Sequence, residues 1–140
     1  MASLDARIYP EGDCISGEDY LTYREQGNQV WLLELDGNWI GNFQVSPVAA
    51  VSDVPAPLRG KGWYLSGIGV FEGFQGQGHG TRLMTEAVDR FGGHRMLGRI
   101  RIGNTRSVRV SLRAGFSPRM NQTRDGVVWV WFERESGWRN

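Results

Sequence analysis

One segment constrains the fold more than any other, because an apolar run, a glycine-rich loop and a helical pattern follow one another in it. The run "WYLSGIGVF", residues 63–71, predicts a strand. The loop "QGQGHG", residues 75–80, comes shortly after it. Apolar residues then recur at helical spacing from about Thr81, and Gly92-Gly93 ends the pattern. The chain therefore turns from a strand into a helix through a glycine-rich loop.

The glycine-rich loop offers a place where an anion can approach the backbone. Gly78 and Gly80 carry no Cβ, so another molecule can come close to the main chain there. A helix that begins at about Thr81 directs free N–H groups and the positive end of its dipole toward the loop. Such a place suits a phosphate, but turns also use glycine, so the sequence on either side of the loop decides.

Turn and cap residues divide the rest of the chain into further elements. The pattern within residues 29–45 predicts two strands joined at Asp36-Gly37-Asn38, and a last strand pair within residues 116–133 turns near Asp125-Gly126. The other expected elements are a helix over residues 16–26, a loop with three prolines over 46–61, a strand over 96–102 and a short helix over 105–114 that Asn104 caps. This order predicts an α/β (α+β) domain built around one sheet.

Length and composition favour one soluble globular domain over residues 1–140. Apolar residues make up 40% of the chain and charged residues 22%. No apolar run approaches the roughly 18 residues that span a membrane, and the N-terminus has no segment of signal-peptide type. The single Cys14 excludes an internal disulfide and fits the cytoplasm, and with only two histidines no metal site is expected.

Two motifs stand in a fixed order around the predicted strand 96–102. The first is Val70 followed by Gln75-Gly76-Gln77-Gly78-His79-Gly80 and a helix. The second is Asn104 at the start of a short helix, Ser107 three positions later, and Gly115-Phe116 at its end. Together they cover about residues 63–116 and resemble the GNAT superfamily of acetyl-CoA-dependent N-acyltransferases. The resemblance implies a single mixed, mostly antiparallel sheet flanked by helices, and an N-acetyltransferase that uses acetyl-CoA as co-substrate.

The resemblance also implies which residues bind the coenzyme. The backbone of Ile68, Gly69 and Val70 is expected to hold the pantetheine arm as a strand would, and Asn104 to reach that arm with its side chain. The loop is expected to bind the pyrophosphate, with Thr81 and Arg82 meeting its charge. The expected coenzyme-binding residues are Ile68, Gly69, Val70, Gln75, Gly76, Gln77, Gly78, His79, Gly80, Thr81, Arg82, Asn104 and Ser107. Within the loop, His79 holds the variable position and its side chain is expected to face solvent.

The sequence departs from the family pattern where a proton must be handled. Many members carry a tyrosine seven residues after the motif asparagine as the proton donor, and Ser111 stands there in this chain. Asn104, Ser107 and Ser111 share a helical stripe, so Ser111 is expected to face the coenzyme. A serine hydroxyl can hydrogen-bond a sulfur, but it is a weaker acid than a phenol.

The strand before the glycine-rich loop contains no carboxylate or histidine that would act as a base. Several alternatives remain open: a relay through Tyr64 or Ser66 on that strand, a carboxylate such as Asp53 or Glu72 from elsewhere, or positioning of the substrates alone. Ser111 and Tyr64 are the predicted catalytic residues.

Charge is distributed unevenly along the chain. Residues 1–60 hold nine acids and three bases, and residues 61–140 hold six acids and thirteen bases. This favours an anionic coenzyme beside the second half and a cationic acceptor near the first. The acids expected at the acceptor cleft are Glu11, Asp13, Glu18 and Asp19. The favoured acceptor is an amine of a small molecule or a protein, with no membrane partner, and the chain is expected to be a monomer or a homodimer.

Two other function classes stay open. Eight arginines between residues 95 and 124, together with Trp63 and Tyr64 as stacking platforms, are compatible with a nucleic-acid acceptor. A module that binds acyl-CoA without catalysis is the other. Arg106, Arg109 and Arg113 are spaced for one helix face, which is either a solvated surface or a place where Arg106 or Arg109 contacts the ribose phosphate of the coenzyme.

Overall fold

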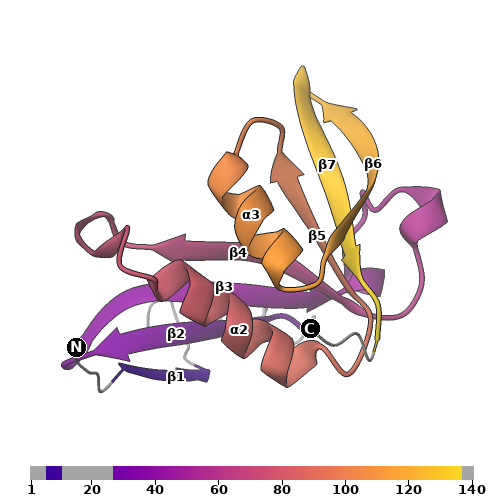
Figure 1. Ribbon diagram of the computed structural model, residues 1–140. Coiled ribbons are helices and arrows are strands. Elements are labelled where there is room, and N and C mark those ends of the chain that lie inside the picture. The colour runs from indigo at the N-terminus through magenta and orange to yellow at the C-terminus, as the bar shows by residue number, and fades with distance from the viewer. Residues whose placement is uncertain (1–5, 11–26, 137–140) are drawn as a thin grey trace.

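The computed structural model describes residues 6–10 and 27–136, which form one seven-stranded sheet with two α-helices (Figure 1). The strands are β1 (Ala6–Pro10), β2 (Gln29–Leu35), β3 (Asn38–Pro47), β4 (Trp63–Val70), β5 (Met96–Arg101), β6 (Ser117–Arg124) and β7 (Val127–Arg134). The helices are α2 (His79–Phe91) and α3 (Thr105–Arg113).

The sheet has the strand order β1-β2-β3-β4-β5-β7-β6. Every neighbouring pair is antiparallel except β4 and β5, which are parallel. The predicted mixed, mostly antiparallel sheet with helices is therefore confirmed. Strand β1 is an element that the sequence pattern did not predict, and the helix expected over residues 16–26 lies outside the described residues.

Two tight turns set the register of the outer hairpins. Asp36 and Gly37 have φ angles of 52° and 81°, and Asp125 and Gly126 have φ angles of 51° and 78°. Two consecutive residues with positive φ give the turn whose twist matches that of paired strands, and Asp-Gly is among the sequences that adopt it most readily. Both predicted hairpin turns are confirmed.

Helix α2 covers one face of the sheet. Its buried residues, among them Leu83 and Phe91, join Ile40 and Phe43 of the sheet in the main core. The helix lies so close to β3 that a Cβ on Gly41 would stand 3.1 Å from Leu83 Cδ1, and the same Cβ would stand 2.7 Å from the Gly69 carbonyl oxygen of β4. Among the described residues no helix is long and apolar enough to cross a membrane.

The connection between β3 and β4 covers the opposite face of the sheet. It contains two short 3₁₀ helices, Val48–Ala50 and Ala56–Leu58, within the region that the sequence predicted as a loop. Its apolar residues Val48, Val54 and Leu58 form a second core with three residues of the sheet, Tyr64, Leu97 and Trp131. This second core lies behind the place where β4 and β5 meet.

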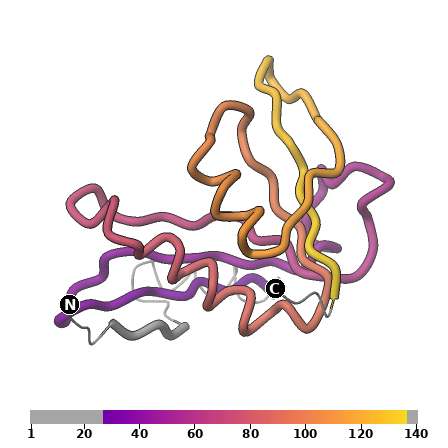
Figure 2. The backbone as a smooth tube through the Cα atoms, viewed as in Figure 1, coloured from indigo at the N-terminus to yellow at the C-terminus, as the bar shows by residue number. Residues whose placement is uncertain are grey.

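Strands β4 and β5 pair only over a short stretch and then diverge. Their partners are Trp63 with Met96 and Tyr64 with Leu97, and no later residues pair. Beyond this point β4 runs toward the loop before α2, whereas β5 turns away with β7 beside it, as the backbone trace shows (Figure 2). The sheet therefore opens between its two halves.

Candidate functional site

A cleft of about 1010 Å³ occupies the opening between β4 and β5. Its first wall is β4, over residues 65–68 and Val70. Its second wall is β5, over residues 98–101, with α3. The loop between β4 and α2 and the first turns of α2 complete the lining. Both sequence motifs therefore meet at one cleft, although about 25 residues separate them in the chain.

Strand β4 presents an unpaired edge to this cleft. Its other edge pairs with β3 from Trp63 to Val70, whereas only Trp63 and Tyr64 pair with β5. Within the described part of the chain, the backbone groups of residues 66–70 that point toward β5 thus have no strand partner. An extended ligand with amide groups completes such an edge as an added strand does.

A β-bulge at Ser66 changes the direction of the side chains along β4. Leu65 pairs with Val45 and Gly67 pairs with Gln44, so Ser66 is the extra residue. Trp63 and Leu65 before the bulge, and Ile68 and Val70 after it, all pack on the α2 side of the sheet. The hydroxyl of Ser66 donates a hydrogen bond to the Gln44 carbonyl oxygen at 3.2 Å. Ser66 itself lines the cleft.

The glycine-rich loop turns tightly into α2. Gly76 and Gly78 have φ angles of 77° and 86°, a region that residues with a Cβ rarely adopt, and Gly78 is the N-cap of the helix. No heavy atom lies within 4 Å of a Cβ built on either glycine. The side chain of Gln75 donates a hydrogen bond to the Val70 carbonyl oxygen at 3.0 Å and ties the loop to the strand end.

Helix α2 begins at His79, two residues earlier than predicted, and this shift decides which groups face the cleft. The N–H of Arg82 already binds the Gly78 carbonyl oxygen at 3.0 Å, so the N–H groups without an intrahelical acceptor are those of His79, Gly80 and Thr81. They lie at the positive end of the helix dipole beside the open space above Gly78.

Asn104 caps the start of α3 as predicted, and it lines the cleft together with Ser107 and Ser111. The Asn104 side-chain oxygen accepts a hydrogen bond from the Ser107 N–H at 3.3 Å, which fixes the helix start. Ser111 lies about one helical turn further along the same face. It is buried, with an exposed fraction of 6%, and it still lines the cleft. The predicted stripe of Asn104, Ser107 and Ser111 thus faces the opening between the strands.

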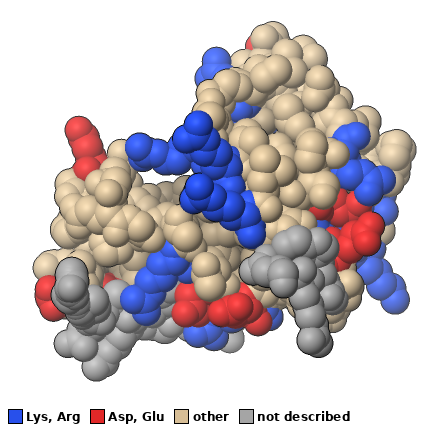
Figure 3. All heavy atoms as spheres, in the orientation of Figure 1, with Lys and Arg blue, Asp and Glu red and all other residues tan. Residues whose placement is uncertain are grey.

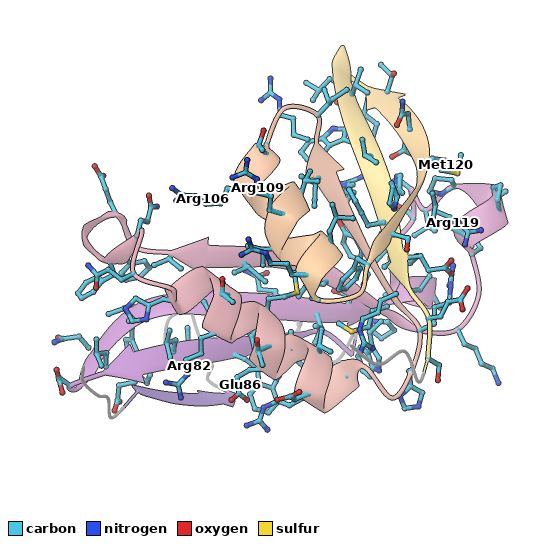
Figure 4. All side chains as sticks on the ribbon, viewed as in Figure 1. Arg82, Glu86, Arg106, Arg109, Arg119 and Met120 are labelled. Atoms are coloured by element: carbon cyan, nitrogen blue, oxygen red, sulfur yellow. The ribbon has the colours of Figure 1, made fainter. Side chains whose placement is uncertain are left out.

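The structure brings most, but not all, of the expected coenzyme-binding residues to the cleft. Those that line it are Ile68, Val70, Gln75, Gly76, Gly78, Gly80, Thr81, Asn104 and Ser107, and those that do not are Gly69, Gln77, His79 and Arg82. The Arg82 side chain lies on the side of α2 away from α3, near Glu86 (Figure 4). His79 does not project into solvent as expected, because its Nε2 is buried and has no hydrogen-bond partner among the described residues.

Tyr64 lies away from the cleft. It packs against Trp131, with ring centroids 5.6 Å apart, in the second core behind the sheet. The reason is the two-residue period of a strand: Trp63 and Leu65 face α2, so Tyr64 faces the other way. Burial raises the pKa of Tyr64, which further disfavours loss of its proton near neutral pH.

The two carboxylates considered as bases are also away from the cleft lining. Asp53 accepts hydrogen bonds from Arg99 and Arg124 and holds the β3–β4 connection against β5 and β6. Burial acts to raise the pKa of Asp53, but the hydrogen bond and charge of Arg99 and the charge of Arg124 hold this pKa below its ordinary value. Glu72 is exposed in the short 3₁₀ helix Glu72–Phe74.

The cleft is basic. Five arginines line it, Arg99, Arg101, Arg106, Arg109 and Arg113, of which Arg99 is paired with Asp53, and among the described residues no carboxylate lines the cleft. Figure 3 shows Lys and Arg side chains gathered beside α3, on the side of the loop that precedes α2. Arg99 and Arg101 were not among the predicted site residues, although both lie on a predicted strand directly before the second motif. A basic cleft suits a ligand with several phosphates.

Comparison with protein families gives the class of the protein. The model of the acetyltransferase (GNAT) family matches residues 1–116. The chain therefore belongs to the GNAT acetyltransferase family and is an acyltransferase, which confirms the resemblance that the two motifs indicated. A search among curated proteins found no match to the sequence.

Solved structures share the fold. A GNAT family acetyltransferase from Elizabethkingia anophelis, solved with acetyl-CoA bound, is 14% identical, covers 94% of this chain and 98% of its own, and has a TM-score of 0.67. A putative acetyltransferase from Acinetobacter baylyi is 14% identical, with 93% and 92% coverage and a TM-score of 0.69. An N-acetyltransferase from Staphylococcus aureus is 12% identical, with 74% and 68% coverage and a TM-score of 0.62.

Proposed function

We propose that the protein binds acetyl-CoA between β4 and β5 and transfers its acetyl group to an amine. The observation that carries this proposal is that three unlike features converge on one cleft. They are the unpaired edge of β4, the open glycine turn into α2, and the polar stripe of α3. The similar fold of the Elizabethkingia anophelis protein, which holds acetyl-CoA, supports the same assignment.

Each feature fits a different part of the coenzyme. The amide groups of a pantetheine arm match the unpaired backbone edge around Ile68 and Val70, and the Asn104 side chain lies across the cleft from that edge. A pyrophosphate matches the free N–H groups of Gly80 and Thr81 and the positive helix end. The space above Gly76 and Gly78 lets the phosphate oxygens approach the backbone closely.

Acetyl-CoA supplies an acetyl thioester, and the transfer forms a carbon–nitrogen bond while the carbon–sulfur bond breaks. The amine loses one proton and the leaving sulfur gains one, so the chain must stabilise the sulfur as it leaves. Ser111 is the residue we favour for this role, because it lines the cleft from a buried position, whereas Tyr64 lies behind the sheet. Its hydroxyl donates a hydrogen bond to the sulfur, and positioning of the two substrates contributes the larger part of the rate.

The acceptor in this proposal is a primary amine. The Staphylococcus aureus neighbour is an N-acetyltransferase, which is consistent with an amine acceptor. The acids Glu11, Asp13, Glu18 and Asp19, on which the preference for a cationic amine depends, lie outside the described residues. A nucleic-acid acceptor has less support, because Trp63 packs against Phe91 at 5.0 Å and Tyr64 against Trp131, so neither ring is a free stacking platform.

The proposal is tested by following thiol release from acetyl-CoA with a panel of acceptors: a polyamine, an aminoglycoside, peptides with a free N-terminus or a lysine, and a single-stranded oligonucleotide. The expected result is thiol release that depends on an amine, with a product heavier by one acetyl group. Release with the oligonucleotide alone would favour the nucleic-acid alternative. Coenzyme binding without release on any acceptor would favour a binding module.

A further inference from the structure

Helix α3 carries a row of arginines for which the proposed function gives no role. Arg106, Arg109 and Arg113 are spaced three and four residues apart, all three are exposed, and all three line the cleft. Figure 4 shows Arg106 and Arg109 projecting from α3 toward the side on which the loop before α2 lies. They therefore stand across the cleft from the N–H groups that suit a pyrophosphate.

The row of arginines lowers the stability of the helix when no anion is bound. Like charges three or four residues apart repel one another along a helix. Arg106 lies in the first turn of α3, where a cation opposes the helix dipole, and that turn contains no acid. Arg113 lies in the last turn, where a cation is favourable. The repulsion and the unfavourable dipole thus concentrate on Arg106 and Arg109.

No protein carboxylate offsets this charge within the described residues. Arg106, Arg109 and Arg113 form none of the ion pairs found there. Several arginines elsewhere form ion pairs: Arg90 with Glu86 at 3.3 Å, and Arg99 and Arg124 with Asp53. The unpaired guanidinium groups of α3 are therefore available to an anion in the cleft.

We propose that Arg106 and Arg109 bind the 3′-phosphate on the ribose of coenzyme A and make the protein select coenzyme A over dephospho-coenzyme A. This inference rests on the proposed function, since it presumes that the coenzyme occupies the cleft. The pyrophosphate has backbone partners on the α2 side, and the remaining phosphate of the coenzyme is the 3′-phosphate on the ribose that follows the pyrophosphate. A phosphate monoester has close to two negative charges at neutral pH, and one guanidinium group can bind two of its oxygens through two parallel hydrogen bonds.

Calorimetry with two ligands and three proteins tests the proposal. The ligands are coenzyme A and dephospho-coenzyme A, which differ only in the 3′-phosphate. The proteins are the parent, the double variant Arg106→Gln with Arg109→Gln, and a control with Lys61→Gln and Arg119→Gln. The control removes the same charge from two exposed residues outside the cleft.

The parent should bind coenzyme A about tenfold more tightly than dephospho-coenzyme A. The α3 double variant should lose this preference by weakening coenzyme A alone, and the control should keep it. The loss of affinity on removing the 3′-phosphate and the loss on replacing the two arginines should not add, because each change removes the same interaction.

Equal weakening of both ligands in the α3 double variant would assign the arginines to the pyrophosphate and overturn the proposal. A parent that binds both ligands equally well would also overturn it, while leaving the proposed function intact. A parent that binds neither ligand would overturn the proposed function and this inference with it. The comparison of ligands on the parent does not depend on how the variants fold.

Discussion

Substitution of Gly78 by alanine separates the role of the glycine-rich turn in binding from its role in folding. Gly78 has a φ angle of 86° at the N-cap of α2, and no heavy atom lies within 4 Å of the position of an added Cβ. The methyl group therefore meets no protein atom, and the cost to folding is the backbone strain alone. A residue with a Cβ in this conformation costs about 1–2 kcal/mol, which lowers the melting temperature by about 3–8 °C in a domain of this size.

Binding should suffer separately, because the methyl group occupies the space through which a phosphate reaches the N–H groups of α2. Loss of one charged hydrogen bond costs about 1.5–3 kcal/mol, or about a tenfold to a hundredfold loss of affinity for coenzyme A. The assay is calorimetry with coenzyme A, below the melting temperature of every variant.

Gly37→Ala is the matched control. Gly37 has a φ angle of 81°, a Cβ built on it also meets no atom within 4 Å, and it lies in the β2–β3 turn, away from the cleft. The two substitutions should lower stability alike, and only Gly78→Ala should lower affinity. The reasoning is refuted if Gly78→Ala, folded and destabilised like the control, binds coenzyme A as the parent does.

Three further predictions concern the reaction, the core and acid stability. Ser111→Ala should lower kcat about tenfold with little change in coenzyme affinity, whereas the control Ser117→Ala, on the exposed start of β6, should change neither quantity. If steady-state assays of Ser111→Ala give an unchanged kcat, Ser111 has no role in the reaction. Gly41→Ala should destabilise the fold by about 1–3 kcal/mol in urea titrations, because its Cβ would lie 2.7 Å from the Gly69 carbonyl oxygen of β4 and 3.1 Å from Leu83 Cδ1 of α2, and wild-type stability would contradict the close packing around Gly41. The pKa of Asp53 is lower in the folded state, so its contribution to stability is complete above the unfolded pKa of 3.8 and is lost as pH falls through the folded pKa. Asp53→Asn should therefore weaken the fall in the free energy of unfolding at acid pH, and an equal fall in parent and variant would exclude the effect.

Local signals were sufficient to predict the elements that end or turn at particular residues. Asp36-Gly37 and Asp125-Gly126 specify turns through their positive φ angles, and Asn104 specifies the start of α3 through its side-chain hydrogen bond. The same local patterns placed Ser111 on the cleft side of α3, because the helical period alone fixes which residues share a stripe with Asn104.

Features that depend on distant parts of the chain could not be predicted in this way. The divergence of β4 from β5 depends on which residues of two strands pair, and the bulge at Ser66 depends on the register with β3. Which face Tyr64 occupies depends on which side of β4 helix α2 covers, because strand alternation shows only that Tyr64 lies opposite Trp63 and Leu65. Arg82 was expected to meet the phosphate, but a two-residue shift in the helix start left its N–H bonded within α2.

The central claim, that the cleft between β4 and β5 holds the coenzyme, is tested most directly by backbone amide chemical shifts during a titration with coenzyme A. The largest shift changes should fall on residues 66–70, on residues 76–81 and around Asn104, the three features that converge on the cleft. A second hollow of about 770 Å³ lies between residues 47–52 and 59–62 of the β3–β4 connection. Changes confined to that hollow, with the cleft residues unmoved, would contradict the account.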